Sequence, residues 1–184
     1  MGVRCFVAVE VEDEAILDAL VRVQAGLKGT GADVKTVERE NIHLTMRFLG
    51  DVDEGRLEDV MDLVSGVEFD PFPMELEGIG VFPNLRRPRV VWVGLTKGVE
   101  ELTGIFNTLE PGLVEMGFRP EGRGFGPHIT IARVRSGRNR GQLVDEVLRC
   151  QGEGFGEFEV RRIRLKKSVL TPRGPLYSTL AESP

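Results

Sequence analysis

Two histidines and two threonines are the residues of this chain best placed to do chemistry. The 184 residues include only two histidines, His43 and His128, and each opens a four-residue stretch with threonine at its third position, HLTM and HITI. Alternate side chains of an extended strand point to the same face. We therefore expect each histidine to lie beside its threonine, Thr45 or Thr130, about 7 Å away between Cα atoms.

A matched pair of histidine and threonine side chains suits in-line displacement at phosphorus. Imidazole titrates near neutral pH, so one ring can accept a proton from an attacking water or hydroxyl. The other ring, held protonated by an adjacent phosphate, can donate a proton to the departing oxygen. Threonine hydroxyls can donate hydrogen bonds to the non-bridging phosphate oxygens. These residues alone do not say which histidine is the acid.

Metal binding and a purely structural role are the alternatives for the two histidines. No Asp, Glu or Cys lies within either tetrapeptide at a spacing that would complete a ligand set, so the sequence favours chemistry without a metal or another cofactor. A histidine without a function is the ordinary case for a single residue. It does not explain two matching stretches in a chain that has no other histidine.

The composition is that of an ordinary globular protein. Hydrophobic residues make up 41% of the chain and charged residues 29%, which favours a folded domain over disorder. The apolar run over residues 3–9 is short and interrupted by Arg4, so it is interpreted as a first strand and not as a signal peptide or a membrane span. A cytoplasmic location is expected. Cys5 and Cys150 match no zinc or redox spacing and are expected to be reduced and buried.

The charge pattern allows a local basic site but not a generally basic surface. A net charge of -5 argues against a protein that coats nucleic acid over its whole surface. Basic residues nevertheless cluster at residues 86–89, 133–140 and 161–167. Most such side chains are simply solvated, so the clusters alone do not identify a ligand.

Hydrophobic periodicity predicts helices and strands in alternation. The predicted helices cover residues 12–28, 57–64, 102–116 and 143–148, the third bent or interrupted at Pro111. The predicted strands cover residues 3–9, 34–37, 43–49, 74–82, 90–95, 158–170 and 176–180, with one more strand beginning at His128 after a glycine-rich loop.

Each half of the chain repeats the order helix, His-x-Thr-x strand, helix, strand. This order indicates an α+β fold made of a pseudo-symmetric duplication, each lobe an antiparallel sheet with helices on its outer face. Residues 1–184 are expected to form one domain of two intertwined lobes, with the transition between them near residues 83–88. Pseudo-symmetric lobes can bring the two histidine strands together across a groove.

The motifs resemble those of the 2H phosphoesterase superfamily. HLTM is followed by RFLG, and HITI lies within GPHITIARV. More narrowly, the chain is similar to the RNA 2′,3′-cyclic phosphodiesterases, also called 2′-5′ RNA ligases. The likeness runs from RCFVAVEV through GIGVFPNLRRPRVVWVGL to KSVLTPRGPLYSTL, and so covers nearly the whole chain.

This resemblance implies a groove between the lobes with His43 and Thr45 on one wall and His128 and Thr130 on the other. It implies hydrolysis of a 2′,3′-cyclic phosphate to a 2′-phosphate without a metal, and in some members reversible 2′-5′ joining of tRNA halves. The family pattern makes His43 the proton donor to the leaving 3′ oxygen and His128 the proton acceptor that activates water.

The resemblance also implies further substrate contacts. Arg133 matches a basic residue that follows the second motif, although strict alternation places it on the face opposite His128, so that a bulge or the strand end must redirect it. Phe82, Trp92 and Tyr177 are similar to aromatic positions of the family and are candidates to stack on an RNA base. A place in the core is the competing interpretation of each aromatic residue.

The expected partner is RNA with a 2′,3′-cyclic phosphate end, either a single-stranded end or a tRNA half, and no membrane. Two other functions fit the same motifs: a non-catalytic module that binds cyclic-phosphate ends, and a phosphodiesterase acting on a small cyclic nucleotide. The clustered arginines favour the longer RNA chain, because each contacted phosphate adds affinity. The sequence does not decide the oligomeric state, for which a monomer is the simplest expectation.

Overall fold

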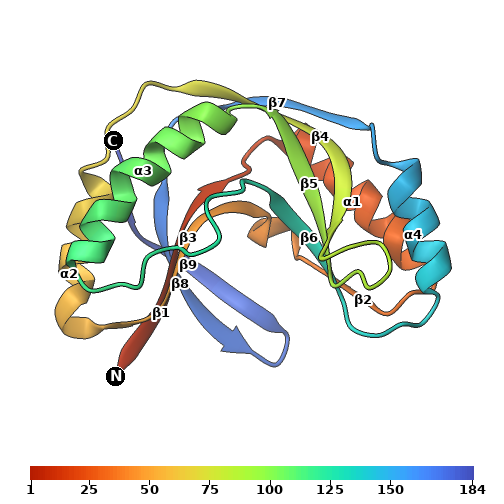
Figure 1. Cartoon of the computed structure of the whole chain (residues 1–184), viewed down its shortest axis with the longest axis horizontal. Coiled ribbons are helices and arrows are strands. Elements are labelled where there is room, and N and C mark those ends of the chain that lie inside the picture. The colour runs from red at the N-terminus through yellow and green to blue at the C-terminus, as the bar shows by residue number, and fades with distance from the viewer.

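The computed structural model describes residues 1–184, and its strands form one nine-stranded antiparallel sheet (Figure 1). Neighbouring strands follow the order β7-β4-β5-β6-β3-β1-β8-β9, and β2 lies beside β6. The strands are β1 (Gly2–Glu10), β2 (Val34–Thr36), β3 (His43–Asp53), β4 (Phe72–Phe82), β5 (Val90–Lys97), β6 (Ile129–Val134), β7 (Gly154–Val160), β8 (Arg164–Thr171) and β9 (Gly174–Glu182). The helices are α1 (Glu14–Gly29), α2 (Glu54–Ser65), α3 (Val99–Glu115) and α4 (Arg140–Arg149), with a short 3-10 helix at Arg39–Asn41.

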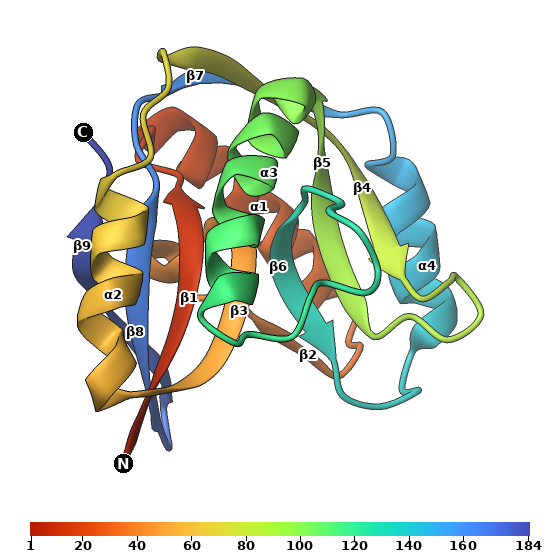
Figure 2. The same ribbon diagram turned by 60° about the vertical axis from the view of Figure 1, so that its left-hand side comes forward.

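The sheet consists of two lobes that meet between β3 and β6. Lobe A contains β1, β3, β8 and β9, and lobe B contains β2, β4, β5, β6 and β7. Helices α2 and α3 cover the outer face of lobe A, and α1 and α4 that of lobe B (Figures 1 and 2). The strands β3 and β6 share one register pair, Leu44 with Ile129. The predicted α+β fold of two antiparallel lobes is therefore confirmed.

The chain passes between the lobes several times. Helix α1 follows β1 of lobe A but packs on lobe B, and α3 follows β5 of lobe B but packs on lobe A. The segment 83–88, where the sequence places the transition, is the loop between β4 and β5 of lobe B. Elements adjacent in sequence therefore often lie in different lobes. The expected transition between the lobes near residues 83–88 stays a prediction.

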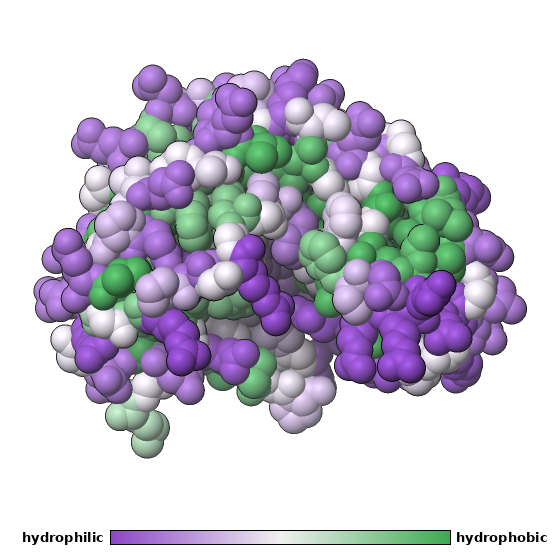
Figure 3. All heavy atoms as spheres, viewed as in Figure 1, coloured by the Kyte–Doolittle hydropathy of each residue, from purple (hydrophilic) through white to green (hydrophobic).

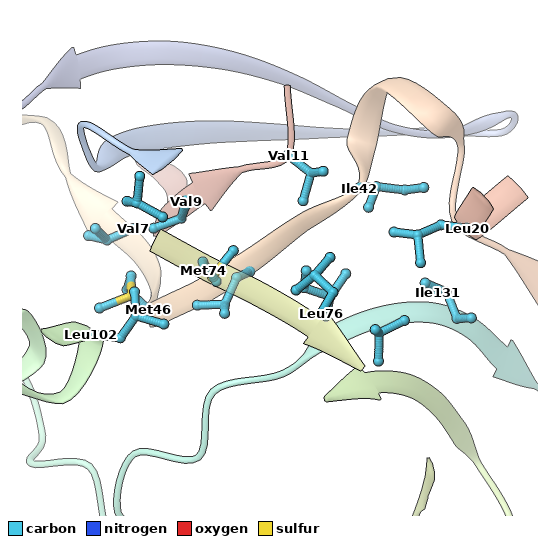
Figure 4. Packing of buried hydrophobic residues seen from close by; sticks show 14 of the residues in the cluster. Val7, Val9, Val11, Leu20, Ile42, Met46, Met74, Leu76, Leu102 and Ile131 are labelled. Atoms are coloured by element: carbon cyan, nitrogen blue, oxygen red, sulfur yellow. The ribbon is translucent and has the colours of Figure 1, made fainter. Parts of the chain in front are cut away.

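One buried core joins the two lobes. A hydrophobic cluster of 39 buried residues includes helices and strands of both lobes. In Figure 4, Val7 and Met46 of lobe A lie at one end of the cluster, Leu20 and Ile131 of lobe B lie at the other, and Leu76 lies between them. Because the apolar contacts continue across the junction, the lobes share a single core.

Pro111 does not interrupt α3, in contrast to the expectation from the sequence. The helix continues through Pro111 to its end at Glu115. The next residue, Gly112, lies so close to α2 that a Cβ atom there would be 2.7 Å from Leu63 Cδ1. The pair Pro111 and Gly112 therefore marks close packing of α3 on α2 and not a break in the helix.

The strand predicted over residues 158–170 is in fact two strands in different lobes. Strand β7 ends at Val160 and pairs with β4, whereas β8 begins at Arg164 and pairs with β1. Between them, Ile163 is fully buried, and its N–H donates a hydrogen bond to Ser183 Oγ at 2.9 Å. Both strands have a buried face, so the apolar pattern runs through the crossover without revealing it.

Candidate active site

The two His-x-Thr-x motifs meet at the junction of the lobes. Leu44 and Ile129, the second residue of each motif, are fully buried and form the register pair between β3 and β6. The residues that flank this pair point to the opposite face of the sheet. The surface of the molecule is hollowed between the lobes (Figure 3).

We call the face that carries His43, Thr45, His128 and Thr130 the histidine face, and all four side chains are half-buried there. Extending the antiparallel register by one residue in each direction places His43 beside Thr130 and Thr45 beside His128. In a regular ladder, diagonal neighbours such as the two histidines lie about 7–8 Å apart. At this separation both imidazoles can contact one phosphate, with a threonine hydroxyl beside each ring.

Both imidazole rings are oriented by the same kind of hydrogen bond. His43 Nδ1 lies 2.6 Å from Asn41 O, and His128 Nδ1 lies 2.7 Å from Gly126 O. A carbonyl oxygen only accepts hydrogen bonds, so Nδ1 carries the proton and Nε2 is left to exchange one. In the neutral ring of His43, Nε2 then accepts a hydrogen bond from Thr45 Oγ1 at 2.9 Å.

A β-bulge at the fourth residue of the first motif changes the alternation of side chains that the sequence predicts. Val7 lies opposite Arg47 and Ala8 opposite Thr45, which leaves Met46 without a partner in β1. Strict alternation would place the arginine of this strand on the histidine face. It is instead 8% exposed and belongs to the buried side.

The residue after this arginine turns in the other direction. Phe48 is 64% exposed, although alternation from Leu44 predicts that it is buried. Its partner in the register is Phe6, whose ring also contacts His43 with centroids 4.9 Å apart. Phe48 therefore lies on the histidine face and not on the buried side that regular alternation would give it.

Strand β6 has a bulge at the equivalent position. Trp92 lies opposite Thr130 and Val91 opposite Ala132, which leaves Ile131 without a partner in β5. Ile131 and Ala132 are both fully buried, so the next residue turns to the histidine face. Each bulge is at the fourth residue of its motif, and the two strands therefore depart from regular alternation in the same way.

Arg133, the predicted phosphate contact, is the residue that this second bulge redirects. Its side chain is exposed, and its position after the bulge places it on the histidine face. Burial raises the pKa of Tyr177, and the positive charges of Arg133 and Arg4 oppose that rise. Arg133 thus lies within electrostatic range of Tyr177. The bulge supplies the change of direction that the family resemblance requires.

Gln24 of α1 fixes the bulge in β6. This side chain is 5% exposed and donates hydrogen bonds to Ile131 O at 2.9 Å and Val37 O at 2.8 Å. The amide thereby ties the backbone of the bulged residue to the helix behind it. Motif and strand patterns do not identify Gln24, although a glutamine at an apolar position between Leu20 and Leu27 is a detectable signal.

Arg47 connects the first motif to the loop that carries the second histidine. Its guanidinium donates hydrogen bonds to Glu110 Oε2 of α3 at 2.8 Å, to Phe48 O at 2.8 Å and to Arg119 O. Glu110 Oε1 in turn accepts the N–H of Glu121 at 2.8 Å. Burial raises the pKa of Glu110, but these hydrogen bonds outweigh burial and bring the pKa below its usual value. Sequence alternation gave no signal for this connection.

The two histidines have different surroundings. Burial lowers the pKa of His43, while its hydrogen bond to the Asn41 carbonyl and the charge of Glu10 raise it and Lys166 lowers it. Glu10 is the register partner of His43 in β1, and it forms an ion pair with Lys166. Lys166 also donates to Thr179 Oγ1 at 2.8 Å. A carboxylate therefore lies next to His43.

Aromatic rings are neighbours of the His128 ring. Phe82 and Trp92 approach its ring with centroid distances of 5.0 and 6.4 Å. Trp92 lies flat over Gly80, where a Cβ atom would be 2.2 Å from the indole. Tyr177, the third predicted aromatic contact, lies instead beside His43 at 5.5 Å between centroids. All three predicted aromatic residues are thus close to a motif histidine.

Two cavities lie near these residues. A cavity of about 130 Å³ is next to His43 and is lined in part by Glu10, Lys166 and Tyr177. A larger hollow of about 890 Å³ lies beyond Trp92, between β4 and the end of α4, and neither histidine lines it. Three or more His, Cys, Asp or Glu side chains do not come together anywhere in the chain as a metal-binding group. None of the helices combines the length and the apolar character needed to span a bilayer.

Known proteins resemble the chain in sequence and in structure. The family model described as LigT-like phosphoesterase matches residues 9–92 and again residues 93–177. The RNA 2′,3′-cyclic phosphodiesterase of Aeropyrum pernix is 44% identical over 89% of this chain and 93% of that protein. The protein of the same name from Methanothermobacter thermautotrophicus is 41% identical over 98% of this chain and 97% of its own.

Two crystal structures have the same fold. TT0787 of Thermus thermophilus has a TM-score of 0.81 at 29% identity and covers 97% of this chain, which covers 96% of it. E. coli LigT complexed with 3′-AMP has a TM-score of 0.80 at 23% identity, with coverages of 99% and 97%. Each of the two family matches contains one His-x-Thr-x motif, and the sequence relatives align over most of the chain. The chain therefore belongs to the LigT-like family of the 2H phosphoesterases.

Proposed function

We propose that this protein is an RNA 2′,3′-cyclic phosphodiesterase that opens a cyclic phosphate end to a 2′-phosphate without a metal. The observation that carries the proposal is the Leu44 and Ile129 pair, which brings two histidine and threonine pairs onto one face. The names of the relatives support an RNA cyclic phosphate as substrate. The 3′-AMP complex of E. coli LigT supports a nucleotide ligand.

The proposed reaction uses one proton transfer at each histidine. His128 Nε2 accepts a proton from water as the water oxygen bonds to phosphorus. The bond from phosphorus to the 3′ oxygen breaks, and His43 Nε2 gives its proton to that oxygen. The products are a 2′-phosphate and a 3′-hydroxyl, and proton exchange with solvent restores both rings. Thr45 and Thr130 donate hydrogen bonds to the non-bridging oxygens, whose charge increases in the transition state.

The family pattern gives this assignment of acid and base, and the bound substrate supports it at His43. Glu10 raises the pKa of His43, but burial outweighs this effect and lowers the pKa overall. A bound phosphate adds negative charge next to the ring and favours its protonated form.

The finer features of the proposal concern the natural substrate. We assign a single-stranded RNA end or a tRNA half as the partner, with reversible 2′-5′ joining as a further activity, and the cytoplasm as the place of action of a monomer. The exposed arginines around the β4 to β5 loop, Arg86 and Arg87, support a chain with several phosphates.

Full activity in a chelator is the first expected result. An oligonucleotide with a 2′,3′-cyclic phosphate end is incubated with the enzyme in excess EDTA, and the product is identified as the 2′- or 3′-phosphate. We expect unchanged turnover, because both proton transfers use side chains. We expect only the 2′-phosphate, because the 3′ oxygen is the proposed leaving group. Loss of activity in EDTA that Mg²⁺ or Mn²⁺ restores would contradict the mechanism, and a 3′-phosphate would contradict the regiochemistry.

Glu10→Gln is expected to move the alkaline limb of the pH profile of kcat/KM to lower pH. The negative charge of Glu10 raises the pKa of His43 against the effect of burial, so its removal lowers that pKa further. An acid is active only below its own pKa, so activity is lost at a lower pH. Glu12→Gln is the control, because Glu12 binds Arg164 but does not influence the pKa of His43. A shift of the acidic limb instead would make His43 the base.

A further inference from the structure

We propose that Phe48 and Arg4 form a subsite that binds the nucleotide next to the cyclic-phosphate end, with its base stacked on the Phe48 ring. The subsite rests on the proposed function and predicts that an oligonucleotide is a better substrate than a cyclic mononucleotide. The ligand class is therefore a single-stranded RNA chain of at least two nucleotides.

The position of Phe48 has no structural explanation within the core. The bulge at Met46 turns the Phe48 ring onto the histidine face, where it is 64% exposed. Met46 and Leu49, its neighbours on β3, supply the buried side chains of this part of the strand. Single exposed apolar side chains are common on protein surfaces, and what distinguishes Phe48 is that the Phe6 ring joins it to His43.

Phe48 belongs to a row of rings that begins at His43. The buried ring of Phe6 contacts His43 with centroids 4.9 Å apart and Phe48 with centroids 6.1 Å apart. Phe6 also contacts Tyr177 at 4.9 Å, so it is held from two sides. Phe48 thus rests against a packed ring while it is itself largely exposed, so that a base can stack on it.

The distance along β3 places this platform one nucleotide away from the reacting phosphate. Because of the bulge at Met46, Thr45 lies opposite Ala8 and Phe48 opposite Phe6, a separation of two residues of β1 or about 7 Å at the usual rise of a strand. Among the rings in contact with the histidines, Tyr177, Phe82 and Trp92 are at least partly exposed, and they are near enough for the terminal base. The base at Phe48 is therefore the next one in the chain.

Arg4 gives the subsite a positive charge. It is two residues from Phe6 on β1, which puts it on the histidine face, and its charge together with that of Arg133 acts on Tyr177. Arg4 and Arg133 take part in none of the ion pairs of the structure, although Asp51 is the register partner of Arg4. Both guanidiniums are thus free for backbone phosphates.

The two bulges place different side chains at equivalent positions. Phe48 is the second residue after the bulge at Met46, and Arg133 is the second residue after the bulge at Ile131. One strand therefore presents an aromatic ring where the other presents a cation. An RNA chain has bases on one side and phosphates on the other, so it can place a base on the aromatic ring and a phosphate at the cation.

The test compares Phe48→Leu and Phe48→Trp on two substrates, a trinucleotide with a 2′,3′-cyclic phosphate end and a 2′,3′-cyclic mononucleotide. Phe48→Leu is expected to lower kcat/KM on the trinucleotide about tenfold, mainly through KM, because a stacked base contributes this much. On the mononucleotide the loss stays below about twofold, and Phe48→Trp restores trinucleotide activity. Leu176→Ala is the control, because this side chain has the same exposure of 64% on the outer face of the β8 to β9 hairpin.

Thermal unfolding shows whether each variant is folded, and an exposed residue is expected to change it little. Equal losses on both substrates, or no rescue by tryptophan, would overturn the subsite. A wild-type enzyme that hydrolyses both substrates equally well would overturn the subsite and leave the proposed function intact. A wild-type enzyme that hydrolyses neither would overturn the proposed function itself and the subsite with it.

Discussion

His128→Ala and His43→Ala are each expected to lower kcat on a cyclic-phosphate RNA by about 100- to 10,000-fold, because each removes one of two proton transfers. Substrate affinity is expected to change much less, since the threonines and Arg133 remain. Single-turnover kinetics at saturating enzyme measures the chemical step directly. The double variant is expected to lose less than the product of the two single losses, because the rings act as a unit.

A substrate with a sulfur leaving atom separates the two roles. In a cyclic phosphorothiolate with sulfur at the 3′ bridging position, the leaving thiolate needs no proton, because thiols are far more acidic than alcohols. His43→Ala is expected to regain most of its activity on this substrate, and His128→Ala is not. Rescue of His128→Ala alone would reverse the assignment, and rescue of neither would contradict a protonated leaving group.

Arg47→Met is expected to lower the free energy of unfolding by about 3 kcal/mol, because it leaves the Glu110 carboxylate largely buried without its partner. It also releases Arg119 O, and with it the loop that leads to His128. We therefore expect lower kcat in the remaining folded enzyme. Urea unfolding measures the stability, and hydrogen exchange at the Glu121 N–H reports on the loop.

Two controls accompany the Arg47 prediction. Arg161→Met removes an ion pair with Glu159 that is exposed on both sides and is expected to leave stability unchanged. The dependence of stability on pH gives a second check. Although burial opposes it, hydrogen bonding from Arg47 holds the pKa of Glu110 below its usual value. The stabilisation is therefore present above the usual carboxyl pKa and is lost as pH falls through the lowered value. In Arg47→Met, the loss of stability caused by protonation of Glu110 at acid pH is expected to be absent. If that loss persists, Arg47 is not what lowers the pKa of Glu110.

Local sequence rules were enough to predict which residues share the histidine face near the centre of each motif. Alternation places His43 with Thr45 and His128 with Thr130, and a repeated order of elements predicts two lobes. These inferences need only the period of a strand and the spacing of apolar residues. They succeed because each histidine and its threonine flank one buried residue, Leu44 or Ile129, and both bulges come after the threonine.

The features that the sequence did not reveal depend on partners far away in the chain. The side to which Arg47 and Phe48 turn is decided by how β3 pairs with β1, and that of Arg133 by how β6 pairs with β5. The two bulges are visible only in these pairings. The crossover at Ile163 depends on which sheet edge is free, and the apolar pattern does not record this. Gln24 is recognisable as a polar residue in an apolar row, but not as the donor to a bulge.

The single register pair between β3 and β6 has a mechanical consequence. With so few hydrogen bonds between these strands, the lobes are held together by the core that continues across the pair and by the helices exchanged between them. A movement of one lobe would disturb the packing of both, so the spacing of the acid and the base is set by the whole core.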